Sequence, residues 1–232
     1  MENFKYKIID LTHTLNSEIP SYNGDCGFSI SIDTDYTDCS GLDKFRTQRI
    51  NSRAGMGTHI DAPAHCFANK TTVDNISLEN LVADLIVIKV DGVLNEDFSI
   101  TKEEIEKFEN KNGKINPNTF VAFCTGWSKY WNEPKKYRND LKFPSVSEEV
   151  AHMLLEREIV GLGIDTLSAD TGADGFPVHR AILGADKYLV ENLNMLELLP
   201  PIGAKIIIMP MKICGGTEAP ARIIALIKKD GK

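Results

Sequence analysis

The sequence contains no run of apolar residues long enough to span a bilayer, and residues 1–5 lack the apolar core of a signal peptide. Cysteine is scarce: the five cysteines include no Cys-x-x-Cys pair, and their odd number does not suit a disulfide framework. These absences argue against a membrane-spanning protein and against a disulfide-stapled secreted one. We therefore expect reduced, mostly buried thiols in a cytoplasmic protein.

The sequence has fewer basic than acidic residues. Lysine and arginine number 26 against 33 aspartates and glutamates, which gives a formal net charge of −7, and the basic residues are not gathered in blocks. We therefore expect neither a nucleic-acid partner nor binding to an anionic membrane surface. At 232 residues with 42% hydrophobic content, the chain can bury a full core. No repeat or linker divides it, so we predict one domain over residues 1–232.

Apolar and β-branched runs bounded by turn residues predict strands, and capping patterns predict helices. Strands dominate the first half, whereas helices and strands alternate in the second. This order predicts an α/β domain with a mixed central sheet and few helices. The expected strands cover residues 7–11, 29–33, 45–52, 84–90, 120–126, 159–164, 188–190, 204–210 and 223–227. The expected helices cover residues 77–81, 102–111 and 148–158.

Four further segments carry specific expectations. Residues 29–33 alternate polar and apolar side chains, as a half-buried strand does. Residues 19–25 form a loop that presents Tyr22, and residues 214–220 form a turn. The aromatic residues within 127–131 follow a buried strand, where they would either line a pocket or cover the edge of the core.

Residues 57–65 form the most informative stretch of the chain. Their sequence is Gly-Thr-His-Ile-Asp-Ala-Pro-Ala-His, so two imidazoles and one carboxylate fall at His59, Asp61 and His65. Odd-numbered positions of an extended segment share one face, although Pro63 is expected to end the strand before His65. Neutral His and ionised Asp are ligands that Zn²⁺ or Mn²⁺ takes readily. The plainer alternative is a polar strand end whose His and Asp satisfy each other.

A metal at this stretch would support hydrolysis. Such an ion lowers the pKa of bound water, toward ~7 for zinc, and makes hydroxide available for attack on an amide, lactam, lactone or ester carbonyl. His65, beyond Pro63, is placed to move protons between that water and the leaving group. We interpret the neighbouring Cys66 as a buried thiol on the opposite face, not as a nucleophile. Ser168 lacks a Gly-x-Ser-x-Gly elbow, which argues against serine hydrolysis.

The stretch resembles the signature of the metal-dependent cyclase/hydrolase family, which includes bacterial kynurenine formamidases (arylformamidases) and isatin hydrolases. That signature runs His-x-Gly-Thr-His-x-Asp-x-Pro-x-His. Other segments agree with the family in the same order, so that the resemblance covers nearly the whole chain. These segments are residues 10–12, 19–25 and 163–170, the pair His179 and Glu191 twelve residues apart, and residues 215–222.

The resemblance implies roles for individual residues. His59, Asp61, His179 and Glu191 would be metal ligands, with Asp61 able to bridge two ions. His65 would be the proton donor and acceptor, and Tyr22 would contact a small-molecule substrate. The resemblance also implies the swivelling β/α/β fold of that family, a Zn²⁺ or Mn²⁺ cofactor, and a homo-oligomer, either a dimer or a tetramer.

One position departs from the family pattern. The first histidine of the signature is Gly55 here, and glycine has no side chain with which to bind a metal. The number of ions, one or two, therefore stays open, and a residue from elsewhere could fill the place. His13 is a candidate because it has no other assignment.

Two further functions stay open on the sequence. His59, Asp61 and His179 also compose the two-His-one-carboxylate triad of a non-haem iron oxygenase, although Glu191 and His65 exceed what that chemistry needs. The loss of a ligand at Gly55 is also consistent with a metal- or ligand-binding relative with little catalysis.

Overall fold

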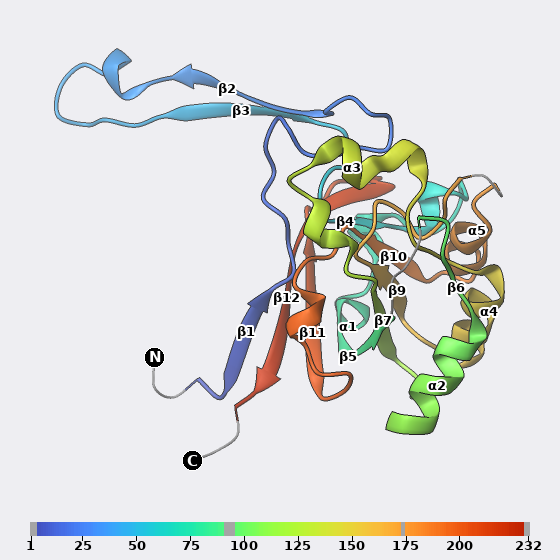
Figure 1. Cartoon of the computed structure of the whole chain (residues 1–232). Coiled ribbons are helices and arrows are strands. Elements are labelled where there is room, and N and C mark those ends of the chain that lie inside the picture. Colours follow the sequence, from blue (N-terminus) through green and yellow to red (C-terminus); the bar gives the residue numbers. More distant parts are fainter. Residues whose placement is uncertain (1–3, 91–95, 173–174, 230–232) are drawn as a thin grey trace.

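The computed structural model describes residues 4–90, 96–172 and 175–229. Residues 1–3, part of the segment considered for a signal peptide, lie outside the described residues. One sheet of eight strands forms the body, and a two-stranded hairpin extends away from it (Figure 1). In spatial order the strands of the sheet are β1 (Tyr6–Asp10), β12 (Glu218–Lys228), β11 (Ala204–Pro210), β5 (Val82–Lys89), β7 (Thr119–Cys124), β9 (Gly161–Ile164), β10 (Tyr188–Glu191) and β4 (His59–Asp61).

The sheet contains both kinds of pairing. Strands β5, β7, β9 and β10 are parallel neighbours, whereas β1, β12 and β11 pair antiparallel and β11 is antiparallel to β5. Every residue of β7 is buried, as expected for a continuous apolar strand covered on both faces. The predicted α/β domain with a mixed central sheet is therefore confirmed.

Strand β4 closes the sheet on itself. Its three residues pair antiparallel with β10 on one side and with β12 on the other. The last strand of the order therefore returns to β12, the second strand, and the residues of β4 gain cross-strand neighbours from distant parts of the chain. This closure positions the site described below.

Three helices cover the outer face of the parallel strands (Figure 1): α2 (Lys102–Asn112), α4 (Glu148–Glu156) and α5 (Pro177–Gly184). Val121 of β7 faces the cluster that these helices bury, whereas Phe120 and Ala122 face the other core cluster. This alternation follows the two-residue period of a strand. The shorter elements are α1 (Leu78–Leu81), α3 (Pro134–Arg138), β6 (Ser99–Ile100) and β8 (Ser145–Val146).

Both capping patterns seen in the sequence are present. The backbone amide of Thr101 donates to Glu104 Oε2 at 2.9 Å, and Ser147 Oγ accepts from the amide of Val150 at 3.3 Å. Helix α2 ends at Gly113, whose φ of 90° is a conformation that favours glycine. These two helices begin where predicted because capping depends only on neighbouring residues.

The hairpin arm consists of β2 (Phe28–Thr34) and β3 (Thr47–Ser52) (Figure 1). The predicted strand over residues 29–33 is confirmed, but half-burial is wrong for the chain taken alone. Ile30 lies opposite Ile50, and these side chains are 51% and 63% exposed. The arm projects from the body, so none of the described elements covers its isoleucines.

Two local predictions are wrong. Residues 218–220, predicted as part of a turn, are the first three residues of β12, because they pair with β4. The cysteines are free as expected, but only Cys124 is buried. Cys66 is exposed because residues 63–65 form a 3₁₀ turn in which strand alternation no longer applies.

The aromatic residues after β7 belong to the core. Trp127 and Trp131 are buried with Tyr137 and Phe143, and Trp127 Nε1 donates to the carbonyl of Tyr137 at 2.9 Å. This observation decides between the two readings of that cluster in favour of packing. Among residues 4–90, 96–172 and 175–229, no helix has the length and apolar character needed to cross a membrane.

Candidate metal centre

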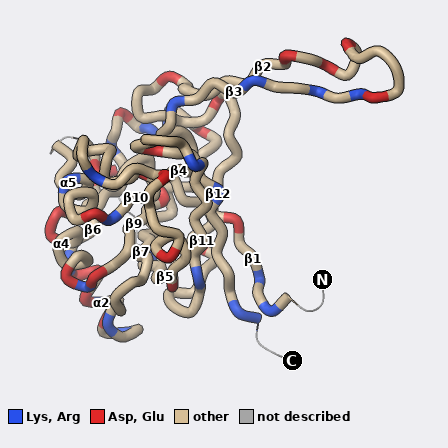
Figure 2. Tube along the Cα trace, turned by 180° about the vertical axis from the view of Figure 1, so that it is seen from behind, with Lys and Arg blue, Asp and Glu red and all other residues tan. Residues whose placement is uncertain are grey.

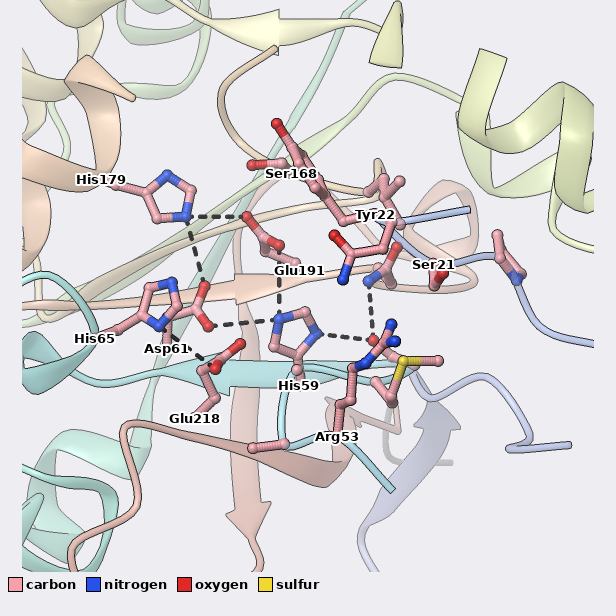
Figure 3. A pocket seen from close by; sticks show the side chains of 18 of the residues that line it. Ser21, Tyr22, Arg53, His59, Asp61, His65, Ser168, His179, Glu191 and Glu218 are labelled. Atoms are coloured by element: carbon pink, nitrogen blue, oxygen red, sulfur yellow. Dashed lines mark hydrogen bonds and ion pairs between the residues drawn. The ribbon is translucent and has the colours of Figure 1, made fainter. Parts of the chain in front are cut away.

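A pocket of about 340 Å³ lies where β4, β10 and β12 meet the loop that carries Tyr22 (Figure 3). Its volume lies within the range of small-molecule sites. All six residues that the sequence predicted for the site line this pocket: Tyr22, His59, Asp61, His65, His179 and Glu191.

Strand register brings three of these residues together. His59 and Asp61 lie two residues apart on β4 and therefore share one face. Glu191, the last residue of β10, is the cross-strand partner of His59 and so faces the same side of the sheet. His179 reaches the pocket from α5, whose first turn follows the loop after β9.

Two imidazoles and two carboxylates form a ring (Figure 3). His59 Nε2 lies 3.4 Å from Asp61 Oδ1 and 3.6 Å from Glu191 Oε2. His179 Nε2 lies 3.7 Å from Asp61 Oδ2 and 3.4 Å from Glu191 Oε1. Two ligand atoms that are each about 2.1 Å from a tetrahedral zinc ion lie about 3.4 Å apart. His59, Asp61 and Glu191 each offer one ligand atom within 4.8 Å of the other two, a spacing that suits a divalent cation. His179 Nε2 faces the other oxygen atom of each carboxylate.

Hydrogen bonds fix which ring nitrogen of each imidazole faces the centre. His59 Nδ1 lies 2.9 Å from the carbonyl oxygen of Gly57, and His179 Nδ1 lies 2.7 Å from Asp170 Oδ2. Because these acceptors have no proton to give, each Nδ1 is the donor, which leaves Nε2 directed at the carboxylates. Metal-binding histidines are commonly held in this way.

The charges and burial of the ring residues are also consistent with a bound cation. Burial raises the pKa of Glu191 to about 7, and repulsion from Asp61 adds to the rise. Burial opposes a charged His59, but Asp61 and Glu191 outweigh it and raise its pKa to about 10. Asp61 is 1% exposed, yet its Oδ1 accepts no hydrogen bond from the described residues. A divalent ion would stabilise the buried carboxylate of Glu191 and give Asp61 Oδ1 a partner, so the residues fit such a metal.

His65 lies in the pocket but outside the ring. It ends the 3₁₀ turn Pro63–His65, so the chain leaves the β4 ladder as Pro63 predicted. Its Nδ1 lies 3.4 Å from Glu218 Oε2, and its side chain is 34% exposed. Its partial exposure distinguishes it from the four enclosed groups and leaves it in contact with solvent.

Tyr22 lines the pocket at its loop side, where its ring lies 6.1 Å from that of Phe176. His13 does not line the pocket. Its ring stacks on Trp131 with centroids 3.9 Å apart, and burial lowers its pKa to about 4. The structure therefore does not support His13 as the replacement for a ligand at Gly55.

Sequence reasoning missed two residues of the centre. Asp170 holds the backbone amide of His179 as well as its ring, and its place after strand β9 was the available signal. Glu218 lines the pocket beside His65. It was assigned to a turn because the two glycines before it suggest one, whereas the apolar alternation that follows it already indicates a strand.

A closed mixed sheet with two imidazoles and two carboxylates ringed in a small pocket defines an α/β protein with a candidate divalent-metal centre. Comparison with known proteins then gives its family. The Cyclase family, whose description is "Putative cyclase", matches residues 9–171, more than half of the chain. The chain belongs to this family.

Named relatives agree with this assignment. Isatin hydrolase of Roseibium aggregatum is 29% identical over 188 residues, 75% of this chain and 72% of that protein. Kynurenine formamidase of Salinibacter ruber is 26% identical over 169 residues, 72% of this chain and 74% of that protein. The solved structure of isatin hydrolase A from Ralstonia solanacearum matches with a TM-score of 0.86 at 30% identity, covering 96% of this chain and 92% of that one.

Proposed function

We propose that this protein is a metal-dependent hydrolase that cleaves a C–N or C–O bond in a small amide, lactam, lactone or N-acyl compound. The observation that carries this proposal is the ring of His59, Asp61, His179 and Glu191 in a small pocket, with His65 beside it. The relatives named as hydrolases support the same class of reaction.

In this proposal the four ring residues hold the ion. A bound Zn²⁺ or Mn²⁺ would supply Lewis-acid chemistry, polarising a carbonyl and making water more acidic. Asp170 orients His179 through its Nδ1, and the carbonyl of Gly57 does the same for His59. Both imidazoles are thereby fixed in the tautomer whose Nε2 binds a metal.

His65 would carry the proton. Glu218 faces its Nδ1 at 3.4 Å, which orients the ring, and its partial exposure lets it exchange protons with water. Such a group takes a proton from the attacking water and returns one to the leaving nitrogen or oxygen. Tyr22 lines the same pocket and would contact the organic part of the substrate.

The names of the relatives suggest two substrates to try first, a cyclic amide such as isatin and an N-formyl aromatic amine. A non-haem iron oxygenase is less well supported. That chemistry needs three protein ligands and open positions, whereas Glu191 adds a second carboxylate 3.4 Å from His179 and 3.6 Å from His59.

Removal of the metal tests the proposal. Dialysis against a chelator should abolish hydrolysis of the lactam and N-formyl substrates, and added Zn²⁺ or Mn²⁺ should restore it; rates measured with each ion would identify the effective metal. Metal analysis of protein purified without added ions would give one or two ions per chain. Full turnover by protein shown to be metal-free would contradict the proposal.

We also propose a cytoplasmic homo-oligomer, a dimer or a tetramer. The five free cysteines suit a reducing compartment. The exposed apolar face of the hairpin arm suits a second copy of the chain, because a two-stranded hairpin is marginally stable alone.

A further inference from the structure

The side chain of Glu218 occupies the space beside Gly55. A Cβ atom built on Gly55 would lie 2.1 Å from Glu218 Oε1 and 3.4 Å from His59 Nε2. The first distance is far below any van der Waals contact, so a side chain at residue 55 and this position of Glu218 exclude each other. The second distance shows that the space taken by Glu218 beside Gly55 lies close to Nε2 of His59, the ring nitrogen that faces the carboxylates.

Strand register explains why Glu218 reaches this point. Glu218, the first residue of β12, is the cross-strand partner of Asp61 on β4. Cross-strand partners face the same side of a sheet, so the two carboxylates point into one pocket (Figure 3). Glu191 enters in the same way from β10, on the other side of β4. The two neighbours of β4 thus each deliver one carboxylate.

The atoms around Glu218 suit a cation. Oxygen atoms of Asp61 and Glu218 and a ring nitrogen of His65 all lie within 4.8 Å of one another. Asp61 Oδ1 is buried and has no hydrogen-bond donor among the described residues. Within the described part of the chain, the one ion pair of Glu218 is with His65. Three carboxylates therefore line one pocket, and no described lysine or arginine forms an ion pair with Glu218.

We propose that Glu218 is a metal ligand of this centre and takes the coordination position that a side chain at residue 55 would otherwise fill. This inference rests on the proposed function, since it concerns the same centre. Glu218 would bind on the His59 side of the ring, together with Asp61. Gly55 leaves the space that this position of Glu218 uses, because a methyl group there would shift Glu218 Oε1.

The competing reading gives Glu218 a role through His65 alone, as a residue that positions the proton-transfer group. The two readings differ in what happens to metal binding. A ligand affects the affinity of the centre for its ion, whereas a residue that only positions His65 affects turnover and leaves that affinity unchanged.

Metal affinity of three single variants tests the inference. Glu218→Ala removes the carboxylate, Gly55→Ala displaces it without changing any charged residue, and His65→Ala removes its ion-pair partner. Competition of Mn²⁺ against a chromophoric chelator, with Mn²⁺ electron paramagnetic resonance as a second readout, measures binding directly. We expect the first two variants to lose about tenfold or more in affinity or one ion per chain, and His65→Ala to stay within about twofold of wild type.

A double variant tests whether a second ligand can restore the metal affinity that Glu218→Ala loses. Gly55→His combined with Glu218→Ala exchanges the carboxylate for an imidazole from the opposite side, and should recover most of the metal affinity that Glu218→Ala loses. Recovery would also exclude misfolding as the cause of the loss.

Failure of this inference is distinct from failure of the proposed function. Wild-type affinity in both Glu218→Ala and Gly55→Ala, with turnover still dependent on metal, would overturn the role of Glu218 and leave the hydrolase proposal standing. Turnover by metal-free wild-type protein would overturn the hydrolase proposal itself.

Discussion

His65 differs from the other two histidines of the pocket in its surroundings. The side chains of His59 and His179 are 6% and 7% exposed, and each ring is held at Nδ1 by an acceptor. The side chain of His65 is 34% exposed. A proton-transfer group must reach both the reacting atoms and water, which an enclosed ligand cannot do.

Replacement of His65 by alanine should therefore lower kcat by about 10²–10⁴ for a lactam or N-formyl substrate. The metal content should stay at the wild-type value, because this side chain lies outside the ring of donors. His152→Ala is the matched control, since that histidine is 60% exposed on helix α4 and does not line the pocket. Unchanged turnover in a folded, metal-loaded His65→Ala protein would exclude the role.

For single residues, the sequence predicted correctly those features that depend on short spacing along the chain. His59 and Asp61 share a face because they are two residues apart on one strand. His179 and Glu191 lie more than a hundred residues further on, and only the family resemblance pointed to them. Asp170 and Glu218 lie in segments that resemble the family, but the resemblance gave them no role, and their contacts with His179 and His65 come from folding.

Helix α2 and the residue just after α4 are joined by an ion pair whose carboxylate is buried. Glu109 of α2 is 2% exposed at its side chain and accepts from Arg157 Nε at 2.9 Å, just beyond α4. Lys114 and the amide of Ile115 also donate to this carboxylate. The hydrogen bond from Arg157 is the main cause that lowers the pKa of Glu109 to about 2, even though burial opposes it.

Glu109→Gln should reduce the free energy of unfolding near pH 7 by about 2–3 kcal/mol. The folded-state pKa of about 2 is below the ordinary value of 4.5. The ion pair therefore contributes its full stability above pH 4.5 and loses it as the pH falls toward 2.

Urea unfolding of wild type and variant at pH 7, 4 and 3 measures this contribution, and the difference should shrink with falling pH. Glu106→Gln, an exposed position on the same helix, should show no such difference at any pH. A gap for Glu109→Gln that widens on acidification would contradict the assignment.

Element boundaries were predicted well where they depend on neighbours in the chain. The capping residues Thr101 and Ser147 begin their helices as expected. The start of β12 was predicted too late because its first residues are ordered by pairing with β4. The link between Glu109 and Arg157 spans 48 residues, so no local pattern could reveal it.

The whole molecule has one feature that the single chain does not explain. The hairpin arm projects from the body and carries an apolar face with Ile30 opposite Ile50 and with Ile32 beside them. Residues of both charges follow one another along the arm (Figure 2), and two ion pairs link them, Arg46 with Asp35 at 2.7 Å and Arg49 with Asp33 at 3.3 Å. In the homo-oligomer that we propose, a second copy of the chain would cover these isoleucines.

We expect Ile30→Asp combined with Ile50→Asp to convert the oligomer into a monomer, because charged side chains cannot be buried without partners. Light scattering coupled to size-exclusion chromatography measures the mass directly. Ser31→Asp, on the opposite face of the same strand, is the control and should keep the wild-type mass. A monomeric wild-type protein would contradict the proposed oligomer.

The sequence by itself determined the local features of this protein: the positions of most long strands, two helices with their caps, and a histidine and a carboxylate on one face of β4. These features follow from contacts within a few residues of the chain. The tertiary structure alone decided the rest: closure of the sheet by β4, the arrival of Glu191 and Glu218 on either side of it, and the exposure of Cys66 and of the arm. Strand register between distant segments is set by packing of the whole core, which no single stretch of sequence contains.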